Sequence, residues 1–589
     1  MSILLPKKEK AWQSKTIPHI TDGIDTSKRS DVLGDSQCIT LNNVRLIKQQ
    51  VLVDTGYTTF GHTISGYPQR SFRFTKKSGT SENILITTAS LYKYNSTHSK
   101  WHLIKGTAGT TTTASAAAGA TTIAVTSASG FASTELVGIT LDNGDQHQTT
   151  ISVSGLTFTL TDAIPSGRSV ANGASVIRAV VLAGTRDDPV DADTVASHDW
   201  FVFTNGVNIV QRYDGTDCVV VPNLPSAGNT ICKSVAVYNS ALFLLNTTEG
   251  GTAYPQRVRR SDQSDPTNWT TGTSGYDDLY DSSDTILAGW PLGPYLIIYR
   301  SLSITRGRFI GSGGINYQFN TVVSGDGAIA AGGIVDIGEY HIVVGNNNVY
   351  EYRGGFDTKP IGDALVNRLF STRGNLSPQY KSKLFAFHMK QMNEVCIVYP
   401  DTGSTYPNKA LRYSIDTKAW YERSFAHTFT GYGPFLAVAS FSWNDLVGSW
   451  LDQVWQWNSS SMVTQADTIL LCSAESSQVY EYDYVSTLDN TTAIQYTVET
   501  KDFVLTDSEF RLDTVTLYMQ GTSVLLEYSV DQGLSWNTLS TITQPTMGKV
   551  LIGKQLVANT IRFRLSGTSP DFKLSWIYIS FKIESLYLY

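Results

Sequence analysis

One short motif near the C-terminus combines side chains that could do chemistry. Residues 529–536 read Ser-Val-Asp-Gln-Gly-Leu-Ser-Trp, a pattern that places a carboxylate inside a tight hairpin turn. The Asp531 side chain can accept hydrogen bonds from the turn backbone, Gly533 permits a positive φ, and Trp536 can pack beneath the turn. We therefore interpret these residues as a structural turn, comprising Ser529, Asp531, Gly533 and Trp536.

The same pattern leaves a catalytic alternative open. Sialidases carry several copies of this motif, one in each propeller blade, whereas this chain has one copy in its C-terminal region. A glycan-cleaving site would also need paired carboxylates that face one cleft. The single, displaced copy favours the structural interpretation over a glycosidase site.

Two acidic runs have the closely spaced carboxylates that calcium favours. Residues 277–284 read Asp-Asp-Leu-Tyr-Asp-Ser-Ser-Asp, and residues 186–193 read Arg-Asp-Asp-Pro-Val-Asp-Ala-Asp. Carboxylate oxygens are ligands of hard cations, but neither run has the Asp-x-Asp-x-Asp-Gly order of a defined calcium loop. We interpret both runs as solvated turns.

The histidines and cysteines form no recognisable metal or redox motif. The nine histidines are scattered without metal-ligand spacing, among them His98, His102, His341 and His388. The five cysteines are an odd number without a Cys-x-x-Cys pair, which favours buried free thiols: Cys38, Cys218, Cys232, Cys396 and Cys472. Neither a Gly-x-Ser-x-Gly elbow nor a phosphate-binding loop is present. The sequence therefore predicts no catalytic, cofactor or metal residues, and a chain that is not an enzyme.

The composition indicates that β-strands position these residues. A chain of 589 residues is too long for one hydrophobic core, so we expect about two to four domains. Only 16% of the residues are charged, while 30 Tyr, 23 Phe and 12 Trp suit half-buried pleated surfaces. The 48 glycines suit the turns between strands.

The charge distribution argues against a grip on nucleic acid and against a membrane span. The net charge is −6, whereas a protein that holds phosphates needs a local excess of Lys and Arg. The longest basic run, Lys7-Lys8-Glu9-Lys10, is interpreted as a charged tail. No stretch approaches the roughly 18 apolar residues that span a bilayer, and the N-terminal charges follow a short apolar run, the reverse of a secretion signal. We expect synthesis and retention in a cytoplasm.

Similar segments recur at regular intervals through the middle of the chain. Each combines an aromatic or β-rich strand with a polar turn and often a Trp. The anchor positions Tyr213, Arg259, Thr305 and Tyr352 are separated by 46, 46 and 47 residues, close to the roughly 40–50 residues of a four-stranded propeller blade. Related segments surround Tyr94, Tyr413 and Tyr482. This spacing predicts a β-propeller.

One long interval has a visible cause. Tyr94 and Tyr213 are 119 residues apart, and the composition changes at residues 107–178 to Thr- and Ala-rich sequence and then to short alternating stretches. Without those 72 residues the interval is 47, which restores the period. We therefore expect a small β domain inserted into a propeller loop.

The C-terminal region has a different pattern. Beyond about residue 485, segments such as 493–500 and 560–565 alternate polar and apolar residues with period two. This alternation predicts a β-sandwich of about 100 residues. Residues 377–390 open with Ser-Pro, a helix start signal, and are the one helix that we expect.

The predicted fold is all-β, with a β-propeller core, an inserted small β domain and a C-terminal β-sandwich. We expect residues 1–45 to form an N-terminal arm with the first strands. The discontinuous propeller takes residues 46–106 and 179–484, the insert residues 107–178, and the sandwich residues 485–589.

The N-terminal segments carry three short motifs in succession. Residues 22–27 read Asp-Gly-Ile-Asp-Thr-Ser, residues 38–46 Cys-Ile-Thr-Leu-Asn-Asn-Val-Arg-Leu, and residues 54–61 Asp-Thr-Gly-Tyr-Thr-Thr-Phe-Gly. Together they resemble the opening of the tail nozzle and tail accessory proteins of short-tailed bacteriophages. Asp54-Thr55 stands where that family usually has a basic residue.

The resemblance continues through roughly four-fifths of the chain. Residues 257–269, 297–304 and 349–362 are similar to the propeller core of the same family, and so is the C-terminal region with its Ser529–Trp536 turn. The insert resembles small β modules that decorate many phage structural proteins. Each motif is short, and their order along the chain carries the resemblance.

The resemblance implies a non-enzymatic virion protein, assembled in the host cytoplasm and located in the tail. Proteins of that family form a homohexameric tube that conducts and gates DNA ejection. The partners implied are further copies of the chain, portal and adaptor ring proteins, tail fibres or spikes, and double-stranded DNA that passes without specific binding. Two alternatives stay open: a virion-associated glycan-binding or glycan-cleaving β-propeller, and an intracellular propeller scaffold.

Overall fold

A computed structural model describes residues 13–17, 19–312, 315–371, 374–438, 465–505 and 508–586. Within these ranges it contains 47 strands, one four-residue helix, α1 (Val366–Leu369), and three 3-10 turns, η1 (Ala331–Gly333), η2 (Asp363–Leu365) and η3 (Lys381–Lys383). The prediction of an all-β fold is confirmed. The basic run at residues 7–10 lies outside the described residues.

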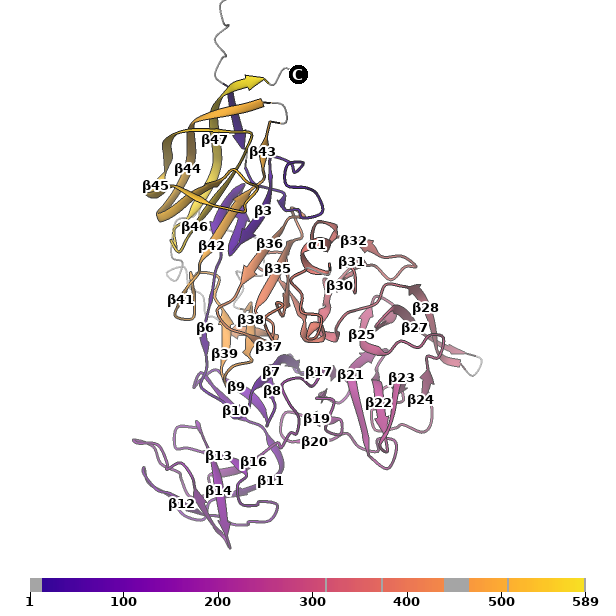
Figure 1. Cartoon of the computed structure of the whole chain (residues 1–589). Helices are drawn as coiled ribbons and strands as arrows, with labels where there is room; N and C mark the ends of the chain where they lie inside the picture. Colours follow the sequence, from indigo (N-terminus) through magenta and orange to yellow (C-terminus); the bar gives the residue numbers. More distant parts are fainter. Residues whose placement is uncertain are drawn as a thin grey trace, which may run out of the picture.

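Seven sheets surround one axis and form a β-propeller (Figure 1). Each blade is given from its first strand outwards. Blade 1 consists of β7 (Pro68–Thr75), β8 (Ser81–Thr87), β9 (Leu91–Asn95) and β10 (Lys100–Leu103), and blade 2 of β17 (Asp191–Val195), β18 (Trp200–Thr204), β19 (Gln211–Tyr213) and β20 (Cys218–Val220). Blade 3 consists of β21 (Thr230–Tyr238), β22 (Ala241–Glu249), β23 (Thr252–Arg260) and β24 (Gly275–Asp278), and blade 4 of β25 (Ile286–Leu292), β26 (Tyr295–Arg300), β27 (Ser303–Ser312) and β28 (Ile315–Ser324).

Blades 5 to 7 complete the ring. Blade 5 consists of β29 (Ile334–Asp336), β30 (His341–Val344), β31 (Val349–Tyr352) and β32 (Lys359–Pro360). Blade 6 consists of β33 (Phe385–Met389), β34 (Glu394–Tyr399), β35 (Lys409–Ser414) and β36 (Trp420–Ser424). Blade 7 consists of β37 (Phe429–Val438), β38 (Gln465–Ser473), β39 (Val479–Tyr482) and β6 (Tyr57–Phe60). The first strands of neighbouring blades lie side by side around the axis, for example β37 with β7 and β17 with β21.

The repeat seen in the sequence corresponds to one strand of each blade. Tyr213, Arg259, Thr305 and Tyr352 all lie in the third strand of their blades. The third strands of the other three blades contain Tyr94, Tyr413 and Tyr482. The regular spacing therefore arises because each blade repeats the same four-stranded unit.

Apolar clusters fill the spaces between neighbouring blades. Between blades 1 and 2, for example, Phe74, Ile84 and Phe201 belong to one buried cluster. Equivalent clusters lie between each further pair, including blades 7 and 1. Because both faces of an inner strand are covered, such a strand reads as a continuous apolar run, as in the fully buried β18.

The ring closes by joining distant parts of the chain. β6, from the N-terminal region, pairs with β39 as the outermost strand of blade 7, with Tyr57 opposite Tyr482. On the inner side, Gly431 and Gly433 of β37 approach the backbone of β7 so closely that a Cβ atom would collide with it. Closure therefore depends on an antiparallel strand pair and on two positions without side chains.

A six-stranded unit is inserted between blades 1 and 2 and lies at one end of the molecule (Figure 1). Its strands are β11 (Lys105–Thr111), β12 (Thr122–Ala124), β13 (Leu136–Thr140), β14 (Gln146–Ser154), β15 (Thr157–Leu160) and β16 (Ser175–Ala179). They enclose a separate apolar core that includes Val137, Ile151 and Phe158. The insert therefore has its own hydrophobic core.

The C-terminal domain lies at the opposite end (Figure 1) and includes N-terminal strands. Its own strands are β42 (Tyr496–Thr500), β43 (Phe503–Val504), β44 (Ser508–Ser529), β45 (Asn537–Ala558), β46 (Thr560–Gly567) and β47 (Lys573–Leu586). β1 (Gln13–Ile17), β3 (Gln37–Asn42), β4 (Val44–Ile47) and β5 (Gln50–Val53) join the same sheet. β2 (Gly23–Ile24) connects that sheet to blade 6, and β40 (Leu488–Asp489) with β41 (Thr492–Ala493) extends blade 7.

The helix expected at residues 377–390 is wrong. The structure has only η3 there, followed by β33, the first strand of blade 6. Phe385, Phe387 and Met389 enter the cluster shared with blade 7, while Ala386 enters the cluster shared with blade 5. This alternation buries both faces of a strand, and it outweighs the helix start signal of Ser-Pro.

None of the described helices is long and apolar enough to cross a membrane.

Candidate functional site in the central cavity

A cavity of about 630 Å³ lies on the propeller axis, near the beginning of the first strands. All seven blades contribute to its wall, through residues that include Gln69, Arg70, Asp187, Asp191, Lys233, Trp290, Gly332, Lys383, Phe385 and Tyr432. Cavities of roughly 300–1,000 Å³ are typical of small-molecule sites. The cavity combines charged groups with aromatic rings.

Asp187 is the most exposed of the three carboxylates in this wall, the others being Asp188 and Asp191. Its Oδ1 atom lies 2.7 Å from Lys383 Nζ and accepts a hydrogen bond of 2.8 Å from Tyr406 Oη. Desolvation acts to raise the pKa of Asp187, but the hydrogen bonds from Lys383 and Tyr406 outweigh it and hold the pKa below its ordinary value. Asp187 is therefore an ionised acceptor at neutral pH.

Asp191, at the start of β17, has the opposite environment. Its side chain is 19% exposed, and its Oδ2 atom accepts hydrogen bonds from Ser234 Oγ at 2.6 Å and from the Val235 amide at 3.2 Å. Desolvation raises its pKa, against the opposing charge of Arg70 and those hydrogen bonds. Two carboxylates of one cavity thus have pKa values shifted in opposite directions.

Asp193 lies two residues further along β17 but does not line the cavity. Its Oδ2 atom accepts a hydrogen bond of 2.6 Å from the Val237 amide of β21. Desolvation raises the pKa of Asp193 to about 6. Asp191 and Asp193 therefore both bind backbone amides at the edge of the neighbouring blade, and Asp191 alone of the two also faces the cavity.

Cations and rings alternate on the wall near Asp187. Lys383 Nζ lies 3.9 Å from the centre of the Tyr406 ring, and the Arg186 guanidinium lies 5.0 Å from it. Elsewhere on the wall, the Arg70 guanidinium lies 5.5 Å from the Tyr432 ring centre. Such a wall can hold a polar ligand by hydrogen bonds from charged groups and by stacking on rings.

The two acidic runs of the sequence have different environments. In residues 186–193, Asp187 and Asp191 line the cavity rather than a solvated turn. In residues 277–284 the carboxylates bind arginines: Asp278 pairs with Arg257 at 2.8 Å, and Asp284 pairs with the fully buried Arg300 at 2.7 Å. The sequence did not reveal the cavity because most of its residues are far apart in the chain. The closely spaced Asp187, Asp188 and Asp191 were the available signal.

The structure places the C-terminal motif in the turn between β44 and β45. Ser529 Oγ donates to Asp531 Oδ1 at 2.7 Å, and the Gly533 amide donates to Ser529 Oγ at 2.8 Å, with Gly533 at a φ of 91°. Hydrogen bonds from the Ser535 and Ser529 side chains lower the pKa of Asp531 to about 2. Trp536 is half-buried and stacks on Arg564, whose guanidinium carbon lies 4.0 Å from the ring centre. The motif belongs to this turn and lies outside the central cavity.

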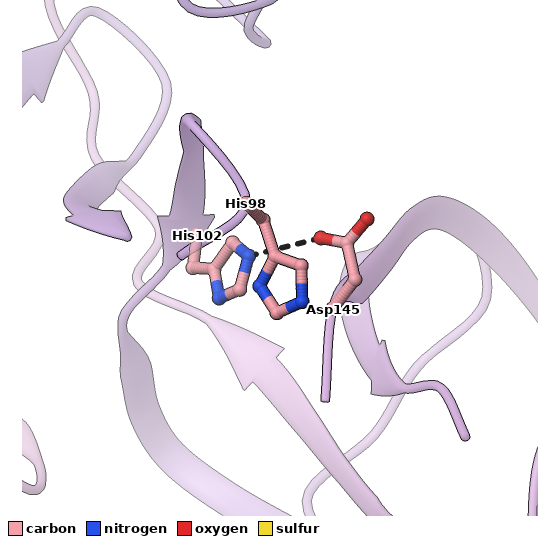
Figure 2. Close-up of side chains that lie close together, drawn as sticks. All are labelled: His98, His102 and Asp145. Atoms are coloured by element: carbon pink, nitrogen blue, oxygen red, sulfur yellow. Dashed lines mark hydrogen bonds and ion pairs between the residues drawn. The ribbon is translucent and has the colours of Figure 1, made fainter. Parts of the chain in front are cut away.

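The other residues singled out in the sequence are the cysteines and several histidines. All five cysteines are buried free thiols, as predicted, and burial raises the pKa of Cys396 to about 12. His341 Nδ1 lies within hydrogen-bond distance, 2.8 Å, of the Tyr299 hydroxyl in the propeller core. His98 and His102, which the sequence shows without metal-ligand spacing, lie together with Asp145 of the insert (Figure 2).

Comparisons with known proteins give fold likeness alone. No protein-family model matches the chain, and no curated protein matches it. Solved structures that match include an exo-β-1,3-galactanase from Phanerochaete chrysosporium, at 9% identity and a TM-score of 0.21, over 89% of this chain and 100% of that chain. Xyloglucan PUL GH43B of Bacteroides ovatus matches at 9% identity and a TM-score of 0.21, over 68% of this chain and 97% of that chain. PorZ of Porphyromonas gingivalis, an essential surface component of the type-IX secretion system, matches at 10% identity and a TM-score of 0.27. The match covers 82% of this chain and 60% of that chain.

These matches correct one prediction. The chain was expected not to be an enzyme, but several of the matching structures are glycoside hydrolases. The expectation relied on missing linear motifs, whereas a propeller builds its cavity from residues that are distant in sequence. At these identities and TM-scores the likeness does not transfer an activity or a substrate to this chain.

Proposed function

We propose that the central cavity binds a short glycan and that Asp187 and Asp191 are an acid–base pair for cleaving it. The observation that carries the proposal is that two carboxylates of one cavity have pKa values shifted in opposite directions. Environments that separate the pKa values of two carboxylates distinguish a general acid from a base. Glycoside hydrolysis uses such a pair.

The roles follow from the local contacts. Asp187, kept ionised by Lys383 and Tyr406, would act as the base or charge stabiliser. Asp191, whose pKa is raised by desolvation, would donate the proton to the leaving oxygen. Tyr432 and Trp290 supply rings for the apolar faces of sugars, and Lys233 supplies a donor for hydroxyl groups.

The test uses the full-length chain. Binding is measured on an array of oligosaccharides, and cleavage is measured as new reducing ends from the bound glycans. Asp187→Asn and Asp191→Asn should each abolish cleavage. Asp193→Asn is the matched control, because Asp193 makes the same kind of contact with β21 without lining the cavity; it should keep full activity.

The outcomes separate the two parts of the proposal. Binding that Tyr432→Ala weakens, without any new reducing ends, would retain the glycan site and reject the acid–base pair. No binding to any glycan, or equal loss of activity in Asp193→Asn, would reject the cavity as the site.

A second candidate function is that of a tail nozzle subunit, and a separate observation favours it. In the described part of the chain, the 22-residue strand β45 pairs only with β44, so its outer edge is open. Its exposed face carries Leu551 at 69% and Val557 at 51% exposure. An unpaired edge strand with exposed apolar side chains is a site for association with another chain, which supports assembly into a ring such as the proposed homohexamer.

Light scattering and electron microscopy of the purified chain test this candidate. A six-fold tube would support it, and Leu551→Lys with Val557→Lys should then reduce assembly. Duplex DNA should bind weakly at physiological salt, because each copy has a net charge of −6. A strictly monomeric chain, or tight and salt-dependent DNA binding, would contradict it.

A further inference from the structure

The contact between the insert and blade 1 brings together three side chains that can bind a metal. The hairpin of β9 and β10 presents His98 and His102, and the turn between β13 and β14 of the insert presents Asp145. Figure 2 shows the three side chains directed toward one another from these two elements. The insert and the propeller thus each supply part of the group.

The geometry is compact. One ligand atom from each residue lies within 4.8 Å of the other two. His102 Nε2 lies 3.0 Å from Asp145 Oδ1, and the two imidazole rings are stacked with centres 5.7 Å apart. His98 Nδ1 is buried and has no hydrogen-bond partner among the described residues. The other ring nitrogen, His98 Nε2, lies 3.3 Å from the Asn143 carbonyl oxygen, so Nδ1 is the nitrogen that is free to bind a ligand.

We propose that His98, His102 and Asp145 bind a divalent transition metal, with Zn²⁺ as the best match. Two imidazole nitrogens and one carboxylate oxygen suit zinc, which often keeps a water as its fourth ligand when the protein supplies three. The same donors are a poor match for Ca²⁺ or Mg²⁺, which favour all-oxygen sites. The site is separate from the central cavity.

Neighbouring groups orient the ligands. Asn95 Nδ2 lies 3.4 Å from His102 Nδ1, which leaves His102 Nε2 directed at Asp145. The Gln146 amide donates to Asp145 Oδ1 at 2.8 Å. Contacts of this kind fix the orientation of metal ligands.

One neighbour competes with the metal. Lys100 Nζ lies 2.6 Å from Asp145 Oδ2. Its side chain is 44% exposed on a flexible stem, so it can turn toward solvent when a cation binds. The site therefore has two states, with either the ammonium group or the metal bound to Asp145.

The metal would cross-link the insert to the propeller. The junction includes hydrogen bonds, such as that from the Leu103 amide to Gln146 Oε1 at 2.6 Å, and apolar contacts of Leu136 and Ile177 with blade 1. A metal with ligands from both sides would restrict rotation of the insert about its two connecting segments. Metal binding should therefore change the stability of the junction as well as fill the site.

The experiment is titration of the metal-free full-length chain with Zn²⁺ alone, followed by calorimetry. One high-affinity ion per chain is expected, and His98→Ala, His102→Ala and Asp145→Ala should each weaken binding by at least about tenfold. Co²⁺ in the same site should give the absorption of a histidine-coordinated ion, which the variants lose. Mg²⁺ should not compete.

Two variants make the test specific. Lys100→Met should bind Zn²⁺ more tightly than the parent chain, because it removes the competing charge without removing a ligand. His198→Ala is the matched control. Like His98, His198 lies in a hairpin turn before a strand that contains a Trp, and the residue after it has a positive φ: 52° at Asp199, compared with 53° at Ser99. It should bind like the parent chain.

The proposal fails if the folded parent chain binds no Zn²⁺ with one-to-one stoichiometry. It also fails if the three ligand variants bind as tightly as His198→Ala does. Circular dichroism of each metal-free variant establishes that it is folded, and Lys100→Met provides a gain of affinity that misfolding cannot produce.

Discussion

Arg412 and Asp54 form an ion pair in the protein interior, across 358 residues of sequence. Arg412 Nη1 donates to Asp54 Oδ1, and the two side chains are 1% and 0% exposed. Arg423 adds a second cation at 3.2 Å from Asp54 Oδ2. Asp54 was singled out in the sequence as a departure from a basic residue, and the structure shows that it binds two buried arginines of blade 6.

Asp54→Ala should lower the free energy of unfolding by about 3–5 kcal/mol, because it leaves two buried cations without their shared partner. Urea-induced unfolding measures the change. The control is Asp31→Ala, which removes an ion pair with Arg29, a side chain that is 81% exposed; it should cost at most about 1 kcal/mol. Equal effects of the two substitutions would contradict the importance of the buried pair.

Asp193 should make stability depend on pH. Its pKa in the folded chain, about 6, is above the ordinary value of 3.8, so between about pH 4 and pH 6 the folded state holds a proton that the unfolded state releases. Stability from this group is therefore present at low pH and is lost as the pH rises through that window. Between these pH values the free energy of unfolding should fall less in Asp193→Asn than in the parent chain, by on the order of 1–2 kcal/mol.

The measurement for Asp193 is the free energy of unfolding at pH 4.5 and at pH 7, in the parent chain and the variant. The difference between the two proteins isolates this carboxylate from the others. A parallel pH dependence in both would mean that Asp193 has an ordinary pKa.

Deleting residues 107–178 should leave a folded remainder. The ends of the insert meet, because Lys105 pairs with Ala179 and the Val180 amide donates to the Ile104 carbonyl at 3.3 Å. The insert also has its own core. A short Gly-Ser link should therefore preserve a soluble chain that unfolds cooperatively, as measured by calorimetry. Aggregation or a broad, non-cooperative transition would show that the propeller needs the insert.

Trp536→Ala should destabilise the C-terminal domain by about 1–2 kcal/mol, less than the loss of a fully buried aromatic residue. The sequence suggested that Trp536 packs beneath the turn, but the ring is half-buried and stacked on Arg564. Trp536→Phe keeps a ring for the guanidinium and should restore most of the stability. Thermal unfolding measures both, and a loss in Trp536→Phe equal to that in Trp536→Ala would contradict the stacking role.

The sequence by itself determined the strand content, the propeller and its repeat. Tyr213, Arg259, Thr305 and Tyr352 recur at a regular interval because each lies in the third strand of a blade, and each blade repeats the same four-stranded unit. The alternation in the C-terminal strands has the same origin, since one face of each strand is buried.

Only the tertiary structure decided the sites. Asp187 and Lys383 meet at the cavity wall, and His98 and Asp145 meet across a domain junction, because the closed ring and the docked insert bring distant residues together. Local sequence does not contain these distances. The same applies to β33, where Ser-Pro favours a helix but burial between two blades requires a strand.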